Sequence, residues 1–320
     1  MRSPIRPWLV AAALAVSGCG NYSTEDLRFL AALPQREDLA FRVPATGQPG
    51  ALSSCPTRTS SVWLEAKPTS DKINAGVDFL LALVDVVRSH EPSWRKADER
   101  GWGPFPSKEH PGREVMVVMA RTYPPELGGG ARYGYAFLAR LQGTPDWTGL
   151  IGGQFDGGSA SRGKGSVVLD FDQMIALGMS DAGTPTGQMA ITYDRASDPV
   201  TIELVLASDG FGAVGTGSTF AYRSAGYAAG GGAFDFAFRD AQGNLFYVTT
   251  GYDAAGAGRD AVVYHAAAGG TAGFRECWGA GACLVYVQDS LNISCDPQAY
   301  GGACSLGVET DCPAVPASPF

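Results

Sequence analysis

The chain has few of the side chains that metal sites and acid–base catalysis use. Its 320 residues include only three histidines, His90, His110 and His265, and none of them lie at a metal-ligand spacing on a helix. No GxSxG motif marks a nucleophilic serine, and no CxxC pair marks a zinc site. We therefore assign no catalytic residue, metal ion or cofactor, and expect that the chain is not an enzyme.

Charged residues and long apolar runs are also scarce. Charged residues make up 18% of the chain, against the usual quarter, and the formal net charge is -8. This acidic balance repels nucleic acid, so we expect no nucleic-acid partner. The apolar run Trp8–Val16 is too short to span a bilayer. Glycine, in contrast, is abundant at 43 residues, which is typical of a β-rich protein with many turns.

The N-terminus has the order of a secretory signal. Two arginines precede the apolar run and small residues follow it, which predicts a signal peptide over residues 1–18. The motif "VSGC" resembles the lipobox of bacterial lipoprotein precursors. That resemblance implies cleavage after Gly18, lipid attachment at Cys19 and anchoring to a membrane. Because Gly20 is not the aspartate that retains many such proteins at the inner membrane, it implies the outer membrane, on its periplasmic or its cell-surface face. The alternative is an ordinary signal peptide with a chance cysteine.

Six further cysteines are expected to form disulfides, because export exposes them to an oxidising compartment. They are Cys55, Cys277, Cys283, Cys295, Cys304 and Cys312. Five of them lie in the last quarter of the chain, so if all six pair within one chain, one of the five bonds Cys55. Cys277 and Cys283 flank the glycine turn "WGAGA" and are expected to form a local pair. A metal site is the competing interpretation, but no histidine lies inside the cluster.

Two segments have helical patterns. Ser23 with Asp26 three residues later resembles a capping box, which predicts a short helix that ends at Pro34. Apolar residues at helical spacing predict an amphipathic helix over residues 70–89 with one face on a sheet. We expect four regions: the signal peptide 1–18, a lipid-anchored segment 19–45 with the short helix, an antiparallel β domain 46–290 that includes helix 70–89, and a Cys-rich tail 291–320.

From Glu114 onward the apolar pattern has a period of two. About a dozen such runs follow one another, separated by glycine-rich turns, with almost no helix after residue 180. In "GAFDFAFRD" the three phenylalanines share one face, and Asp235 and Arg239 are expected on the opposite, exposed face. Short connections require antiparallel pairing. The prediction is a mainly β fold, a curved antiparallel meander, half-barrel or open barrel, with one amphipathic helix packed on it.

Two glycine motifs look like nucleotide-binding loops, but strands are predicted after both. "GGSASRGKGS" has Gly165 where a magnesium-binding hydroxyl is needed, and "GFGAVG" is followed by "TGSTFAYRS". We interpret both as loops. The segments "FDGGSASRG" and "YDAAGAGRD" align at an offset of 97 residues, which indicates two related hairpin units. "RGWGPFPSKEHPG" is expected to be a loop that forms a binding edge or caps the sheet.

This last segment and "FLAALPQREDL" are similar to uncharacterised lipoproteins that high-GC Gram-negative bacteria carry in several copies. That group brings no assigned activity. We expect a membrane-anchored envelope lipoprotein with a non-catalytic structural or surface-interaction role and an unknown protein or apolar-ligand partner. The first alternative is a carrier of an apolar ligand in a half-barrel cavity, and the second is a hydrolytic envelope enzyme. A filled sheet interior favours the structural role, whereas a cavity favours the carrier.

Overall fold

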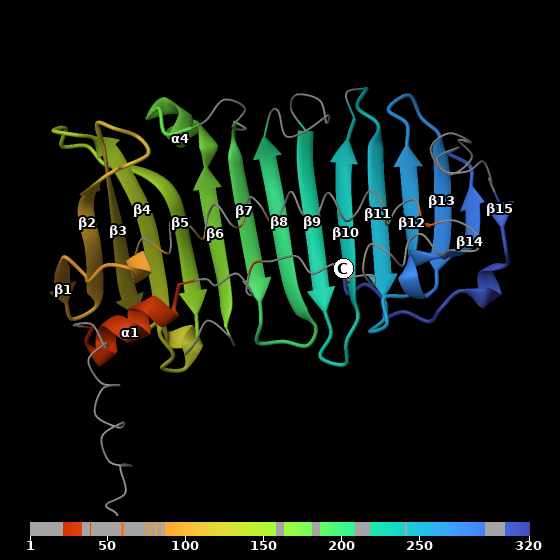
Figure 1. Ribbon diagram of the computed structural model, residues 1–320, viewed down its shortest axis with the longest axis horizontal. Coiled ribbons are helices and arrows are strands. Elements are labelled where there is room, and N and C mark those ends of the chain that lie inside the picture. Colours follow the sequence, from red (N-terminus) through yellow and green to blue (C-terminus); the bar gives the residue numbers. More distant parts are fainter. Residues whose placement is uncertain are drawn as a thin grey trace, which may run out of the picture.

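One open sheet of 15 antiparallel strands dominates the computed structural model (Figure 1). The structure describes residues 22–33, 39, 59–60, 74, 77, 81, 85, 87–157, 163–180, 186–208, 218–240, 242–291 and 305–320. Each strand pairs with the next along the chain, from β1 to β15. The predicted mainly β meander is therefore confirmed, and it stays an open sheet because β1 and β15 are its two edges.

The element bounds are as follows. The first seven strands are β1 (Trp94–Lys96), β2 (Glu99–Pro106), β3 (Arg113–Thr122), β4 (Arg132–Leu141), β5 (Thr148–Asp156), β6 (Lys164–Asp170) and β7 (Gln188–Asp194). The other eight are β8 (Val200–Ser208), β9 (Ser218–Gly226), β10 (Gly232–Arg239), β11 (Leu245–Tyr252), β12 (Gly258–His265), β13 (Thr271–Trp278), β14 (Leu284–Asp289) and β15 (Ser305–Leu306). The named helices are α1 (Thr24–Ala31) and α4 (Phe171–Ala176), and short 3-10 turns are η2 (Pro125–Leu127), η4 (Ala280–Ala282) and η5 (Glu309–Asp311).

Both edges of the sheet are short. β1 has three residues, two of which are Arg95 and Lys96, and β15 has two. Short or charged edge strands offer little unpaired backbone to another chain. An open sheet of this width can therefore end at both sides without templating further strand pairing.

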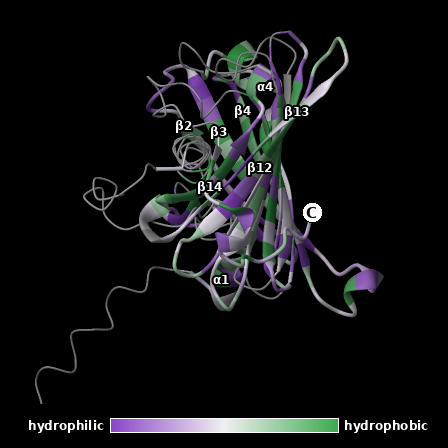
Figure 2. Ribbon diagram, turned by 90° about the vertical axis from the view of Figure 1, so that its right-hand side faces the viewer, coloured by the Kyte–Doolittle hydropathy of each residue, from purple (hydrophilic) through white to green (hydrophobic). Residues whose placement is uncertain are grey.

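The two faces of the sheet differ in chemistry, as the two-residue period predicts. A row of directly opposed residues crosses one face, which we call the core face: Met119, Tyr135, Gly153, Val167, Ile191, Leu204, Tyr222, Phe236, Val248, Val262 and Phe274. A neighbouring row on the opposite face, the outer face, is small or polar: Ala120, Gly134, Gln154, Ser166, Thr192, Glu203, Arg223, Asp235, Thr249, Ala261 and Arg275. Figure 2 shows α1 and the C-terminal end of the chain on opposite sides of the sheet.

Helix α1 covers the core face near β1–β4 (Figure 1). The predicted capping box is confirmed, since the Ser23 side chain accepts from the Asp26 N–H and the Asp26 carboxylate accepts from the Ser23 N–H. The Asp26 carboxylate is fully buried and also accepts from Arg100 Nε (2.6 Å) and Arg95 Nε (3.0 Å). Burial alone would raise the pKa of Asp26, but the hydrogen bonds from Ser23, Arg100 and Arg95 lower it to about 2.

The predicted helix over residues 70–89 falls mostly outside the described residues. Those described in it, at positions 74, 77, 81, 85, 87 and 88, are helical. Val77 and Val87 are fully buried and Leu81 nearly so, whereas Asp85 is exposed. These residues agree with the predicted amphipathic pattern, and all three apolar ones belong to the core cluster of the sheet.

The segment "RGWGPFPSKEHPG" is largely a strand, so the predicted loop is wrong there. β2 runs from Glu99 to Pro106, with a register shift between Trp102 and Phe105. Trp102 is fully buried and its Nε1 donates to the His90 carbonyl oxygen (2.9 Å). Pro104 is tolerated because the shifted register interrupts the ladder with β3 at this point, and Pro106 is the last residue of the strand.

Aromatic rings lie over glycines on neighbouring strands throughout the sheet. In five directly opposed pairs, an added Cβ on the glycine would overlap the ring: Trp94–Gly101, Tyr135–Gly153, Tyr193–Gly165, Tyr252–Gly232 and Trp278–Gly258. A glycine opposite an aromatic residue recovers the packing that a bare backbone lacks. Part of the high glycine content is therefore explained by ring packing as well as by turns.

The turns that follow β9 recur at a spacing that the sequence analysis missed. Tyr227, Asp240, Asp253 and Ala266, 13 residues apart, each open a turn closed by backbone hydrogen bonds to the residue four positions on. A glycine with positive φ stands three positions after each, at Gly230, Gly243, Gly256 and Gly269. The two segments aligned at an offset of 97 residues both connect consecutive strands. Phe137 lies opposite Ile151 but Phe234 lies opposite Thr250, and the duplication stays a prediction.

Substitution of Gly258 tests the ring packing. In Gly258→Ala the new methyl group would overlap the fully buried Trp278 ring and approach the Gly251 carbonyl oxygen (2.7 Å). We expect a loss of about 1–3 kcal/mol in the free energy of unfolding, measured by chemical denaturation. Gly152→Ala is the control, because nothing lies within 4 Å of its added Cβ, and it should be neutral or stabilising by up to about 1 kcal/mol. Equal losses in both variants would contradict the packing role.

Removal of the Asp26 carboxylate tests how α1 is held. Asp26→Ala leaves the buried Arg100 guanidinium without its carboxylate and removes the helix cap, so we expect a loss of about 3 kcal/mol or more. The neighbouring Glu25→Ala is the control, because the Glu25 side chain is 38% exposed and its partner Arg121 keeps a second ion pair with Asp98. Its loss should be much smaller. Thermal and denaturant unfolding of both variants would check this, and similar losses would contradict it.

Candidate functional site

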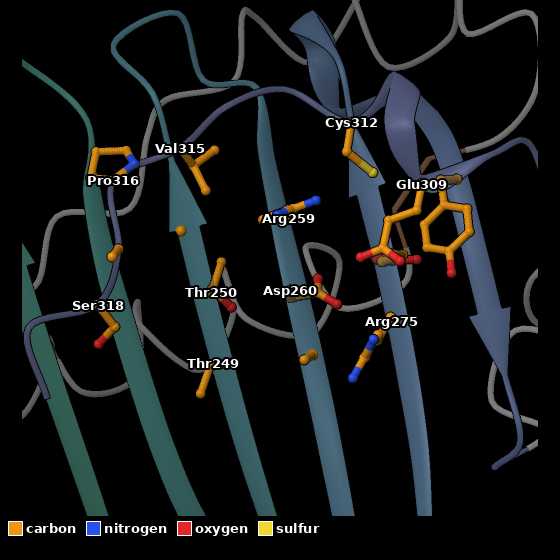
Figure 3. Close-up of a pocket in the computed structure, with 15 residues that line it drawn as sticks. Thr249, Thr250, Arg259, Asp260, Arg275, Glu309, Cys312, Val315, Pro316 and Ser318 are labelled. Carbon is orange, nitrogen blue, oxygen red and sulfur yellow. The ribbon is translucent and has the colours of Figure 1, made fainter.

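A pocket of about 440 Å³ opens on the outer face beneath the C-terminal tail, residues 305–320 (Figure 3). Its floor comes from β11–β14 and its wall from the tail. Its lining residues are Thr249, Thr250, Gly251, Arg259, Asp260, Ala261, Arg275, Glu276, Tyr286, Glu309, Cys312, Val315, Pro316, Ala317 and Ser318. Strand alternation directs Arg259 and Arg275 to the outer face, whereas the side chains of Asp260 and Glu276 point to the core face.

The tail is attached to the outer face at both ends. Cys312 is disulfide-bonded to Cys277 on β13, and the Ser318 hydroxyl donates to Asp235 Oδ2 on β10 (2.7 Å). Between these points it crosses Gly251, whose added Cβ would lie 3.0 Å from a methyl carbon of Val315. A small residue is therefore needed where the tail crosses the strands.

The predicted exposure of Asp235 is wrong, because the tail covers this residue. Its side chain lies on the outer face as predicted but is buried, 6% exposed, because the tail packs over it. Burial raises the pKa of Asp235, while the Ser318 hydrogen bond and the Arg223 charge lower it less. The phenylalanine stack on the other face of β10 is confirmed, with Phe234, Phe236 and Phe238 rings parallel at about 6 Å.

Behind the pocket, a polar row lies on the core face. Asp260 is directly opposite Thr250 on one side and Glu276 on the other, and all three are buried. Ser60 donates a hydrogen bond to Glu276. Burial and the neighbouring Glu276 carboxyl group raise the pKa of Asp260 well above its ordinary value, which favours its protonated form.

The cysteine pairing differs from the expected local pair. Cys277 bonds Cys312, so the predicted Cys277–Cys283 bridge is wrong. The reason is register: Cys277 lies opposite Tyr286 in the β13–β14 ladder, and Cys283 lies in the turn before β14. Cys283 is disulfide-bonded as well, to a residue outside the described part of the chain.

The other predicted cysteine sites lie outside the described residues. They are Cys19, Cys55, Cys295 and Cys304. A link from Cys55 to the C-terminal cluster stays a prediction. Two nearby contacts favour it, because Thr59 forms a backbone bridge with Cys283 and the Ser60 N–H donates to the Ala282 carbonyl oxygen (2.9 Å).

The remaining sequence motifs form no second site among the described residues. Lys164 begins β6, so the strand predicted after the first glycine motif is confirmed, and the strand after the second is β9. His265 is exposed on β12 with its ring 5.9 Å from that of Tyr247. Within the described residues, no three histidine, cysteine or acidic side chains form a group that could hold a metal ion. Helices able to span a bilayer are likewise absent from the described part of the chain.

The sequence analysis missed the two pocket arginines. The sequence patterns include Arg259 only as part of the aligned segment "YDAAGAGRD", and they do not include Arg275. The alternation of "GRDAVVYH" places Arg259 and Asp260 on opposite faces, and that signal was available. The approach of the tail had no local signal, because it depends on a disulfide between residues 35 positions apart.

The raised pKa of Asp260 predicts a pH dependence of stability. Its pKa is raised in the folded protein, so the native state keeps a proton that the unfolded chain loses, and stability falls as pH rises above the ordinary aspartate range. We expect Asp260→Asn to reduce the fall in melting temperature between pH 5 and pH 8. Asp240→Asn is the control, because a hydrogen bond from Asn244 lowers the pKa of Asp240, below this window. A wild-type slope in Asp260→Asn would contradict the assignment.

No protein-family model, curated protein or solved structure matches this chain. The similarity to envelope lipoproteins, which is carried by the sequence around Cys19 and by two short segments, therefore stays a prediction. The described geometry supplies a filled core face, a tail attached across the outer face and one pocket between the tail and the strands.

Proposed function

We propose that this chain is a lipid-anchored protein of the cell envelope with a structural or surface-interaction role. It would be attached to the outer membrane through a lipid on Cys19 and would display the outer face of its sheet. The role would be non-catalytic and would not include transport of an apolar ligand.

The observation that carries this proposal is the filling of the core face. Seven apolar residues of the described N-terminal part are buried in one cluster with the sheet: Phe29, Ala32, Leu33, Leu39, Val77, Leu81 and Val87. A carrier would need an apolar cavity at this place, between sheet and helix. The buried apolar side chains of the described residues that pack against the sheet here support the structural role over the carrier.

A second cluster covers the core face toward the other edge. Its buried members are Val248, Val262, Phe274, Leu284 and Val287. Asp260 and Glu276 border the pocket, but strand alternation directs their carboxyl groups to this core face. A hydrolytic enzyme would need such carboxyl groups in contact with a substrate pocket, so their orientation favours the non-catalytic proposal.

The position of α1 supports display of the sheet away from a membrane. Four residues lie between Cys19 and Thr24, the first residue of α1, so these two residues are five chain steps and at most about 18 Å apart. Helix α1 lies at the β1–β4 end (Figure 1), and 15 strands at about 4.8 Å spacing extend roughly 65 Å. An anchor at Cys19 would therefore hold one end of the sheet near the bilayer and leave a wide, polar outer face accessible.

The test uses a form of the full chain that cannot be lipidated. We expect Cys19→Ser to move the protein from the membrane fraction to the soluble fraction, with Ser17→Ala as a control that keeps the cysteine and stays membrane-bound. Native mass spectrometry of soluble Cys19→Ser should give the mass of the polypeptide alone. Membrane binding by Cys19→Ser would contradict the anchor, and a stoichiometric bound lipid would favour the carrier.

A further inference from the structure

We propose that the pocket beneath the C-terminal tail binds a small phosphorylated ligand, with its phosphate group held between Arg259 and Arg275. The chemistry is that of a phosphate monoester on a body about the size of a monosaccharide. Such a group occurs on soluble sugar phosphates and on lipid head groups, and the experiment below distinguishes these sources.

The first argument is that these two arginines differ from every other arginine that the structure describes. Each of the others has a hydrogen bond, an ion pair or a ring contact. Arg259 and Arg275 have no such contact to any described residue, and both are exposed at the pocket. In a chain with eight more acidic than basic residues, two unpaired guanidinium groups side by side are an unusual concentration of positive charge.

The second argument is geometric. Arg259 on β12 lies directly opposite Cys277 on β13, and Arg275 is two residues before Cys277 on the same strand. Diagonal neighbours on one face of an antiparallel pair have Cα atoms about 7–8 Å apart, within reach of long side chains. Figure 3 shows the two arginines on neighbouring strands, with Arg259 next to the tail and Arg275 farther along β13. One anion between them could receive N–H donors from both guanidinium forks.

The third argument concerns which anion fits. A carboxylate has two oxygens and one negative charge, so it can accept from both guanidinium forks but balances the charge of only one arginine. A phosphate monoester has three terminal oxygens and nearly two negative charges at neutral pH, and it can accept from both forks. The added charge also matters because the protein as a whole repels anions.

Other groups around the pocket define the rest of the ligand. Thr249 and Tyr286 supply hydroxyl groups, and Val315 and Pro316 form an apolar wall. Glu309 is the one opposing charge at the outer rim of the pocket, and it leaves a net positive charge beside the two arginines. The Asp260 side chain points to the other face of the sheet and is buried there, away from the two guanidinium groups on the outer face.

The volume indicates more than inorganic phosphate. Small-molecule sites usually measure about 300–1,000 Å³, and this pocket of about 440 Å³ is in that range. Its wall is held by the Cys277–Cys312 disulfide and by the Ser318–Asp235 hydrogen bond. A ligand with a sugar-sized body would contact both the arginines and the tail.

The test is calorimetric titration of soluble full-length Cys19→Ser protein. We expect binding of glucose 1-phosphate, no measurable binding of glucose, and weaker binding of inorganic phosphate. Arg259→Gln and Arg275→Gln should each weaken the binding of glucose 1-phosphate roughly tenfold or more. Arg259→Lys keeps the charge but loses the fork, so an intermediate loss is expected. Arg239→Gln is the matched control, because Arg239 carries the same charge on β10 and bonds the Gly243 carbonyl oxygen away from the pocket.

A second set of measurements distinguishes the source of the phosphate. Sedimentation with phosphatidylcholine vesicles that contain phosphatidic acid should show arginine-dependent binding if a lipid head group is the ligand, and none if the ligand is soluble. Melting temperatures should be unchanged in the arginine variants, since neither side chain has a described partner. Three results would overturn the proposal: no binding of either phosphorylated probe, an equal loss in Arg239→Gln, or inorganic phosphate binding as tightly as glucose 1-phosphate.

Discussion

The buried ion pair between Asp26 and Arg100 is the contact on which the arrangement of the sheet depends. A single open sheet has no second sheet to cover its apolar face, so another part of the chain must cover it. Asp26 joins the capping of α1 to the second strand, and Phe29 in the same helix packs edge-on against Tyr133 and under Arg100. The Asp26 carboxylate therefore attaches helix α1, which covers the first strands. Hydrogen bonds on two sides stabilise the charge of this buried carboxylate.

The regularity of the sheet follows from two further constraints. Glycines opposite aromatic rings let the rings lie flat on the neighbouring strand, and glycines with positive φ close turns at constant spacing after β9. From β10 to β13 each strand has eight residues and the turns recur at constant spacing, which keeps these strands in register with one another. The composition rich in glycine and poor in charge is the consequence of this architecture.

The chemical difference between the two faces of the sheet explains where binding is proposed. The core face is filled by residues of the same chain, which favours a structural role over transport of an apolar ligand. The outer face is polar and open, and only the C-terminal tail among the described segments crosses it. The tail converts a flat surface into a pocket, and it does so beside Arg259 and Arg275, the two arginines without partners among the described residues.

The local features of the fold could be predicted from the sequence because they depend on neighbouring residues. Ser23 and Asp26 specify the start of α1, the two-residue period specifies the strands, and short glycine turns require antiparallel pairing. The sequence did not predict that β2 is a strand, because prolines obscure its alternating pattern. A proline inside this strand is tolerated only where the register shifts.

The features that the sequence did not determine all depend on contacts between distant residues. Alternation placed Asp235 on the outer face, but its burial requires a tail more than eighty positions away. The pairing of Cys277 with Cys312 rather than Cys283 depends on the β13–β14 register, and the pocket depends on that pairing. Sequence thus determined the strands, the turns and the two kinds of face, whereas tertiary structure decided what covers each face, because long-range packing and register have no local signal.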